Sequence, residues 1–141
     1  VFNLEDLETL VNNFSLQLKK GSIVLLEGEL GAGKTTFARI LINNLYKLNH
    51  LNAPKNIKSP SYPKLLTYYL KDYEIYHYDL YRIQSELELT DLNINENFNN
   101  SITLIEWPKL ILNNVINYKY YLINFEIHSE KTRKIEIKIK N

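Results

Sequence analysis

Apolar residues recur along the chain with different periods, and these periods predict helices and strands. Near the N-terminus, six apolar residues share a helical period: Leu4, Leu7, Leu10, Val11, Phe14 and Leu18. Acidic residues lie in the first turn of this stripe and lysines lie at its end, so we expect a helix over about residues 4 to 19. The continuous apolar run of residues 22 to 27 predicts a buried strand. Helical spacing then returns and predicts a second helix, from near Gly33 to about residue 48.

The next part of the chain is polar and then extended. Residues 49 to 63 contain three prolines and predict a long loop, which makes this segment a functional candidate. Two runs, 64 to 70 and 74 to 81, have the character of strands, and residues 71 to 73 predict the turn between them.

Three further elements precede the C-terminal region. Ser85 and Glu88 have the spacing of a capping box, which predicts a short helix. An asparagine-rich stretch over residues 93 to 101 predicts a loop, and residues 102 to 106 predict another buried strand. Pro108 is expected to begin a short helix or turn that runs to about residue 114.

The C-terminal region predicts a β-hairpin. Apolar residues alternate with polar ones on both arms: Tyr121, Ile123, Phe125 and Ile127, then Ile135, Ile137 and Ile139. Residues 130 to 132 form the expected turn. On the last strand, the face opposite the apolar residues carries Lys134, Glu136, Lys138 and Lys140. They could bind nucleic acid, but a solvated edge strand protected by charge is the favoured interpretation.

A phosphate-binding loop follows the first predicted strand. The pattern G-x-x-x-x-G-K-[ST] is matched by Gly28, Glu29, Leu30, Gly31, Ala32, Gly33, Lys34 and Thr35. Its glycines let backbone amides point at phosphate oxygens, and the following helix adds its free N–H groups. Lys34 supplies charge for the β- and γ-phosphates, and the Thr35 hydroxyl is suited to Mg²⁺. Because strand, loop and helix follow in the required order, we expect the chain to bind a nucleoside triphosphate.

Composition narrows the class of protein. The sequence has 141 residues, a formal net charge of +1 and no cysteine. That length predicts a single domain over residues 1–141, and the balanced charge provides no strong field for nucleic acid. Disulfides and thiolate metal sites are excluded. Without an apolar run of membrane-spanning length or a signal-peptide pattern, a soluble, cytoplasmic protein is expected.

Two acidic residues at strand ends are candidates for the chemistry. Alternation places His77, Asp79 and Tyr81 on one strand face. Asp79 is our choice for the carboxylate on the Mg²⁺ side, although it could simply end a strand in a turn. His77 and Asp79 as a metal pair lack a third partner, so we interpret His77 as a neighbour of the site. Glu106 follows four apolar residues, where a strand's carboxyl end meets a ligand, and could orient water or bind metal through water.

Other residues keep two interpretations each. Trp107 could wall the nucleotide pocket or cap the core. Ser59 and Ser61 could form a segment that senses the γ-phosphate or an ordinary Ser-Pro turn. Arg82 could contact phosphate or a partner, or pair with a nearby acid.

Four sequence blocks together resemble the bacterial TsaE family. They are GELGAGKTT, SPSY, HYDLYR and LIEWP, which span residues 28 to 108 in this order. The last two distinguish this family from other P-loop proteins. Glu29 occupies a position where the family usually has aspartate.

The resemblance implies roles for residues of these blocks. Gly31, Gly33, Lys34 and Thr35 would hold the phosphates and Mg²⁺, with Thr36 following them in the motif. Asp79 would be the Walker-B-like carboxylate, and Glu106 and Trp107 would act beside the nucleotide. The implied fold is α/β, a P-loop NTPase-like domain. Its mixed sheet is flanked by helices, parallel around the phosphate loop and extended by antiparallel strands, including the C-terminal hairpin.

The resemblance also implies a function. The chain would be a weak Mg²⁺-dependent ATPase, activated by partners and binding ATP and ADP. It would support the TsaB and TsaD proteins, of which TsaD transfers a threonylcarbamoyl group to adenosine 37 of tRNA. A small-molecule kinase is the alternative, but it predicts an arginine-rich lid, and only Arg82 and Arg133 follow Arg39. A non-catalytic GTP switch would need an N-K-x-D-type guanine motif, which the sequence lacks.

Overall fold

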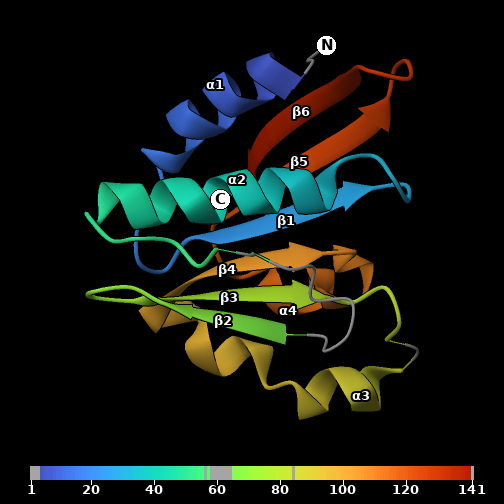
Figure 1. Ribbon diagram of the computed structural model, residues 1–141. Coiled ribbons are helices and arrows are strands. Elements are labelled where there is room, and N and C mark those ends of the chain that lie inside the picture. The colour runs from blue at the N-terminus through green and yellow to red at the C-terminus, as the bar shows by residue number, and fades with distance from the viewer. Residues whose placement is uncertain (1–3, 56, 58–64, 84, 141) are drawn as a thin grey trace.

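The computed structural model consists of a six-stranded sheet with helices against both of its faces (Figure 1). The structure describes residues 4–55, 57, 65–83 and 85–140. The helices are α1 (Leu4–Ser15), α2 (Lys34–Leu48), α3 (Glu86–Asp91) and α4 (Leu112–Val115), with 3₁₀ helices η1 (Ile94–Asn100) and η2 (Pro108–Ile111). The strands are β1 (Ile23–Gly28), β2 (Leu65–Tyr69), β3 (Glu74–Asp79), β4 (Ser101–Glu106), β5 (Tyr120–Ile127) and β6 (Arg133–Lys140). None of the described helices is both long and apolar enough to span a membrane.

The strand order explains where a ligand site can form. The sheet runs β2-β3-β4-β1-β5-β6, and its four inner strands are parallel. Each outer strand pairs antiparallel with its neighbour. This arrangement confirms the predicted mixed α/β sheet. Because the inner strands are parallel, the carboxyl ends of β3, β4 and β1 meet at one edge, where open α/β sheets bind ligands.

Helices α1 and α2 cover one face of the sheet and form the larger core with it (Figure 1). Phe37 of α2 lies at the centre of this layer and is fully buried. Its ring centroid lies 6.0 Å from that of Phe14 in α1 and 5.4 Å from that of Phe125 in β5. One side chain therefore connects both helices and the sheet, and this packing fixes the position of α2 relative to β1.

The opposite face is covered over only part of its width. Phe98, Ile111 and Val115, from the 3₁₀ helices and α4, pack there with Leu25 and Ile105 of the two central strands. These strands are apolar on both faces, as expected for buried parallel strands. The site at their carboxyl ends therefore lies at the end of strands that are buried on both faces.

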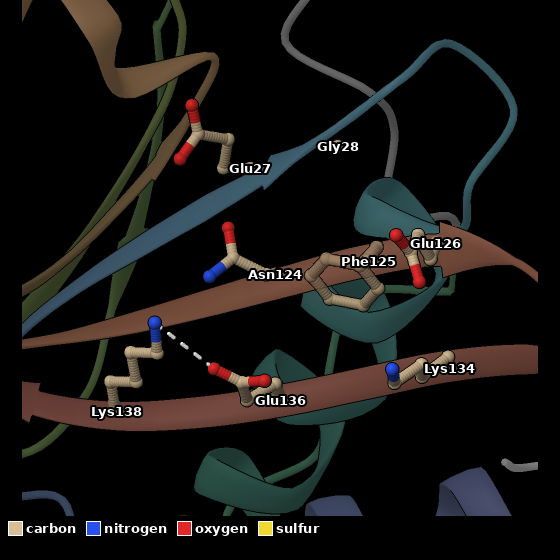
Figure 2. A pocket seen from close by; sticks show the side chains of 8 residues that line it. All are labelled: Glu27, Gly28, Asn124, Phe125, Glu126, Lys134, Glu136 and Lys138. Atoms are coloured by element: carbon tan, nitrogen blue, oxygen red, sulfur yellow. Dashed lines mark ion pairs between the residues drawn. The ribbon is translucent and has the colours of Figure 1, made fainter.

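The β1, β5 and β6 side of that second face carries polar residues (Figure 2). A hollow of about 350 Å³ is lined by Glu27, Gly28, Asn124, Phe125, Glu126, Lys134, Glu136 and Lys138. Glu136 and Lys138 form an exposed ion pair 3.1 Å long. In Figure 2, α2 lies behind the strands, so the hollow and α2 are on opposite faces of the sheet. The prediction that the last strand is a charged edge strand is confirmed.

The first predicted helix is too long. Helix α1 ends at Ser15, not near residue 19, and a turn follows in which the Gln17 amide donates to the Phe14 carbonyl oxygen. The Ser15 hydroxyl donates to the Asn12 carbonyl oxygen at 2.8 Å, a local bond that competes with the helical pattern. Leu18 still packs on the core from the turn. Its apolar period therefore extended the prediction past the true end.

The predicted loop over residues 93 to 101 is also wrong in part. Most of it forms η1, with Ile94 and Phe98 buried at helical spacing. Asparagines dominated the prediction because they favour turns, yet here tertiary packing decides the conformation. The strand predicted to reach residue 81 ends at Asp79. Most of the predicted loop's second half, residues 56 and 58–63, lies outside the described residues.

Several local predictions are confirmed. Ser85 caps α3, since its hydroxyl oxygen accepts a bond from the Glu88 amide at 3.3 Å. The short helix beginning at Pro108 is present as η2 and α4. The C-terminal hairpin forms with its turn closed by hydrogen bonds between Ser129 and Thr132.

Candidate functional site

The phosphate-binding loop connects β1 to α2 at the carboxyl edge of the sheet. Gly31 and Gly33 have φ angles of 80° and 105°, a left-handed conformation that strongly favours glycine. Gly33 is the N-cap of α2, whose first helical residue is Lys34. The free amides of the helix start therefore lie next to the curled loop, the arrangement that binds phosphate.

Lys34 is buried beneath this loop although it carries an ammonium group. Its Nζ donates to the carbonyl oxygens of Gly28 at 2.5 Å and Glu29 at 2.9 Å. It also lies 3.9 Å from the ring centroid of Trp107, a cation–π contact. Burial lowers the pKa of the Lys34 ammonium, while the negative charges of Glu106, Asp79 and Glu29 act in the opposite direction. The Lys34 ammonium group therefore donates to backbone carbonyl oxygens, and phosphate oxygens could take their place as acceptors.

Glu106 reaches the start of α2 from the neighbouring strand. It ends β4, in register with Leu26 of β1 and with Asp79 of β3. The Thr35 hydroxyl donates to Glu106 Oε1 at 2.9 Å. Glu106 Oε2 lies 2.7 Å from His77 Nε2, and both of these side chains are buried. Strand register thus brings together the hydroxyl and the carboxylate that the sequence placed 71 positions apart.

Asp79 lies beside Glu106 at the end of β3. Its Oδ1 accepts a hydrogen bond from the Tyr81 amide at 2.9 Å, and the side chain is only 6% exposed. The Leu80 amide donates to the Glu106 carbonyl oxygen at 3.1 Å, so the two strand ends remain joined beyond the sheet. Asp79 therefore ends a strand in a turn beside the phosphate loop, and its role toward Mg²⁺ stays a prediction.

Trp107 turns the chain sharply after β4. Its φ and ψ are 60° and 62°, a left-handed conformation that is rare for a bulky residue. Its amide donates to the Leu26 carbonyl oxygen at 3.2 Å, which ties the turn to β1. The ring contacts Lys34 on the site side and lies 4.7 Å, centroid to centroid, from the ring of Tyr81. Trp107 also packs against the second core, which confirms the interpretation that it caps the core, while its role as a wall of a nucleotide pocket stays a prediction.

These groups surround a hollow of about 220 Å³. It is lined by Leu30, Gly31, Gly33, Lys34, Thr35, Thr36, Asp79, Glu106 and Trp107. Of the other predicted nucleotide-binding residues, Glu29 is exposed beside it and Ala32 is fully buried in the core. Ser59 and Ser61 lie outside the described residues. His77 lies behind Glu106, as the neighbour that the sequence predicted.

The donors at this hollow fit a shared Mg²⁺ ion. The Thr35 hydroxyl and the carboxylates of Asp79 and Glu106 are hard oxygen donors, which Mg²⁺ prefers. Within the described ranges, no group of three or more His, Cys, Asp or Glu side chains is arranged to hold a metal alone.

Arg133 is a neighbour of the loop that the sequence did not indicate. It begins β6, and its Nη2 donates to the Gly31 carbonyl oxygen at 3.3 Å. Its Nη1 donates to the carbonyl oxygens of Ser129 at 3.0 Å and Thr132 at 2.9 Å. This contact spans 102 positions, and no local pattern in the sequence signals it. Arg82, the other candidate arginine, is exposed after β3.

Comparisons with known proteins agree with this architecture. A sequence profile described as "Threonylcarbamoyl adenosine biosynthesis protein TsaE" matches residues 1–135. A Rickettsia felis protein named "tRNA threonylcarbamoyladenosine biosynthesis protein TsaE" is 37% identical over 93% of this chain and 73% of its own length. Proteins of the same name are 38% identical in Rickettsia typhi, over 91% and 85%, and 32% identical in Bacillus subtilis, over 77% and 65%.

A solved structure supports the fold independently. The crystal structure of YdiB from Bacillus subtilis superimposes with a TM-score of 0.68, covering 99% of this chain and 82% of that one. Its sequence identity of 22% makes this a likeness of fold alone. The profile match over nearly the whole chain, with relatives above 30% identity, establishes the family. The chain belongs to the TsaE family.

Proposed function

We propose that this chain is a Mg²⁺-dependent ATPase that hydrolyses ATP to ADP and phosphate in the biosynthesis of threonylcarbamoyladenosine in tRNA. The observation that carries the proposal is the bond from Thr35 to Glu106 beside the phosphate loop. It unites the predicted metal-binding hydroxyl with a carboxylate that can orient an attacking water. The names of the relatives support the biological role.

In this proposal each residue of the hollow has a distinct task. The loop amides bind the β- and γ-phosphates, and Lys34 exchanges its carbonyl contacts for phosphate oxygens. Thr35, Asp79 and Glu106 would hold a Mg²⁺ ion, which would supply positive charge to neutralise the phosphates. Glu106 would also orient the attacking water toward the γ-phosphate. Trp107 shields the amine of Lys34 from solvent on one side.

The chain's own activity should be weak. Among the described residues that line the hollow there is no arginine. Phosphoryl transfer without such a charge in place loses ~10³–10⁵ in rate. We therefore propose that TsaB and TsaD, the partners implied by the family resemblance, complete or gate the site. The ATP cycle would then support the threonylcarbamoyl transfer to tRNA adenosine 37 without this chain performing that transfer.

The test is phosphate release from ATP by the purified chain, with and without TsaB and TsaD. Stimulation by the pair is the expected result, with Mg²⁺ required throughout. A steady activity that ignores the pair but depends on a small-molecule acceptor would contradict the proposal and favour a kinase. EDTA serves as the control for metal dependence.

A further inference from the structure

His77 contacts the site from within the sheet. It lies in β3 with no exposed surface, and its Nε2 is 2.7 Å from Glu106 Oε2. In the register of β3 and β4, His77 is opposite Leu104 and Asp79 is opposite Glu106. His77 and Glu106 are therefore diagonal neighbours on the same face of adjacent strands, the face that α2 covers. This geometry points the imidazole at the carboxylate from the side opposite the phosphate loop.

Both oxygens of Glu106 are consequently engaged. Oε1 accepts the bond from Thr35 and Oε2 faces His77, so one carboxylate bridges α2 and β3. An ionised carboxylate only accepts hydrogen bonds, so this contact is a hydrogen bond in the tautomer of His77 that carries its proton on Nε2. A glutamate with one oxygen held can rotate about its terminal bond, whereas contacts at both oxygens fix the plane of the carboxylate.

The surroundings of the imidazole argue against a role in packing alone. Its register neighbours on both sides, Leu66 and Leu104, are apolar. Its other nitrogen, Nδ1, is buried without a hydrogen-bond partner in the described part of the chain. Burying a polar ring there is unfavourable unless its bond to Glu106 contributes something. An aliphatic side chain would fill the same space without that cost.

We propose that His77 is a positioning residue that holds Glu106 in the orientation needed beside Thr35. The inference deepens the proposed ATPase function and rests on it. His77 is not among the residues that line the hollow, and it acts by fixing the carboxylate. Partners of this kind behind a metal-site ligand typically change metal affinity or activity by about 10- to 100-fold when lost.

A matched pair of variants isolates the contact. In His77→Gln the amide nitrogen can reach nearly as far as Nε2 and still donate to Glu106. In His77→Asn the same amide is one methylene shorter and falls short of Glu106. Burial and polarity are alike in the two variants, so the difference between them measures the reach to Glu106. His50→Asn, at an exposed left-handed position that asparagine tolerates, controls for loss of a histidine elsewhere.

The readouts are turnover with TsaB and TsaD, and nucleotide affinity by calorimetry with and without Mg²⁺. We expect His77→Asn to lower kcat by about tenfold or more and to lose most of the gain in ATP affinity that Mg²⁺ provides. Its ADP affinity in EDTA should equal that of the wild type, and His77→Gln should restore both losses. Equal losses in the two variants, or a weakened affinity in EDTA, would overturn the inference in favour of a packing role.

The calorimetric affinity measurement allows failure of this inference to be distinguished from failure of the proposed function. A wild-type chain that binds Mg²⁺ and ATP but releases no phosphate would contradict the ATPase proposal. The Mg²⁺-dependent gain in affinity can still be compared between His77→Asn and His77→Gln in that case. An unchanged gain in His77→Asn would then refute the positioning role by itself.

Discussion

At the scale of single residues, Trp107 has an unusual conformation with a clear structural cause. Its left-handed backbone is held between β1 and β3, because its amide bonds to Leu26 and the preceding carbonyl accepts from Leu80. Strained residues of this kind persist where their surroundings determine them, and they concentrate at functional sites. The strained turn places the indole ring against Lys34. Any phosphate that draws Lys34 away therefore changes the environment of the indole.

This contact predicts an optical signal. Trp107 is the only tryptophan in the sequence, so its emission reports on the site alone. Adding ATP or ADP with Mg²⁺ should change the intensity or wavelength of that emission, because the cation above the ring moves to the phosphates. The measurement is a fluorescence titration alongside calorimetry. An emission that stays flat while calorimetry records binding would contradict this account of Lys34.

Lys34 itself provides a second residue-scale prediction. Lys34→Ala should lower turnover by about 10²-fold or more, the usual effect of removing one preorganised donor to developing charge. The unfolding midpoint should not fall, because burial of an ammonium group is itself unfavourable. Lys47→Ala, at the exposed far end of α2, is the matched control. Wild-type turnover in Lys34→Ala would remove the phosphate-loop assignment.

The sequence predicted the members of the site better than their contacts. The loop residues, Asp79 and Glu106 could be identified because a motif or a strand end marks each of them. The bond from Thr35 to Glu106 and the strain at Trp107 could not, since they depend on the register between β1, β3 and β4. Register is a tertiary property that one sequence does not reveal.

At the scale of elements, the β5–β6 hairpin supports the phosphate loop from outside. In register, Gly28 of β1 pairs with Phe125 of β5, and a Cβ added at Gly28 would lie 2.6 Å from the Phe125 carbonyl oxygen. Glycine is therefore needed here for a close approach of two backbones. Arg133 adds a second contact, from the start of β6 to Gly31. Loop and hairpin are therefore joined at two points along this edge.

The hairpin contact predicts an effect on binding without direct contact to the ligand. Arg133→Ala should weaken ADP affinity by about fivefold, corresponding to about 1 kcal/mol for one hydrogen bond that orders the loop. Lys131→Ala, an exposed charge in the same turn, should leave affinity unchanged. Calorimetry of the two variants measures the difference. Equal affinities would show that the loop keeps its shape without Arg133.

Element boundaries were predicted where packing and local pattern agree. The strands and α2 follow the apolar periods, and the hairpin follows its alternation. The errors at the end of α1 and in η1 have different origins, because a local side-chain bond of Ser15 competes with the end of α1, whereas tertiary burial decides the conformation of η1. Leu18 packs from a turn rather than a helix, and Phe98 draws an asparagine-rich segment into a 3₁₀ helix.

At the scale of the whole molecule, the two helical layers differ in what they stabilise. The layer of α1 and α2 holds the phosphate loop's helix on the sheet, whereas the opposite layer covers mainly β3, β4 and β1. The mixed sheet could be predicted because the family blocks imply it. The division into two cores could not be predicted, because the sequence of a strand that is apolar on both faces does not indicate which helices pack on which face.

Substitution of Phe37 tests how strongly α1 and α2 are held on the sheet. Phe37→Ala should lower the free energy of unfolding by about 3–5 kcal/mol, the usual cost of removing a buried aromatic ring. Leu48→Ala, on the same helix with a side chain 47% exposed, should have little effect. Urea unfolding of both variants provides the comparison. Similar midpoints for the two would show that Phe37 does not join the helices to the sheet.

The position of β1 between β4 and β5 has a consequence for synthesis on the ribosome. The phosphate loop is translated early, but the strand beside it and the arginine that contacts it come about a hundred residues later. A nascent chain that has not yet reached β5 carries its central strand with one open edge. Under the proposed function, we therefore expect affinity for nucleotide to appear only after β5 and β6 have been translated.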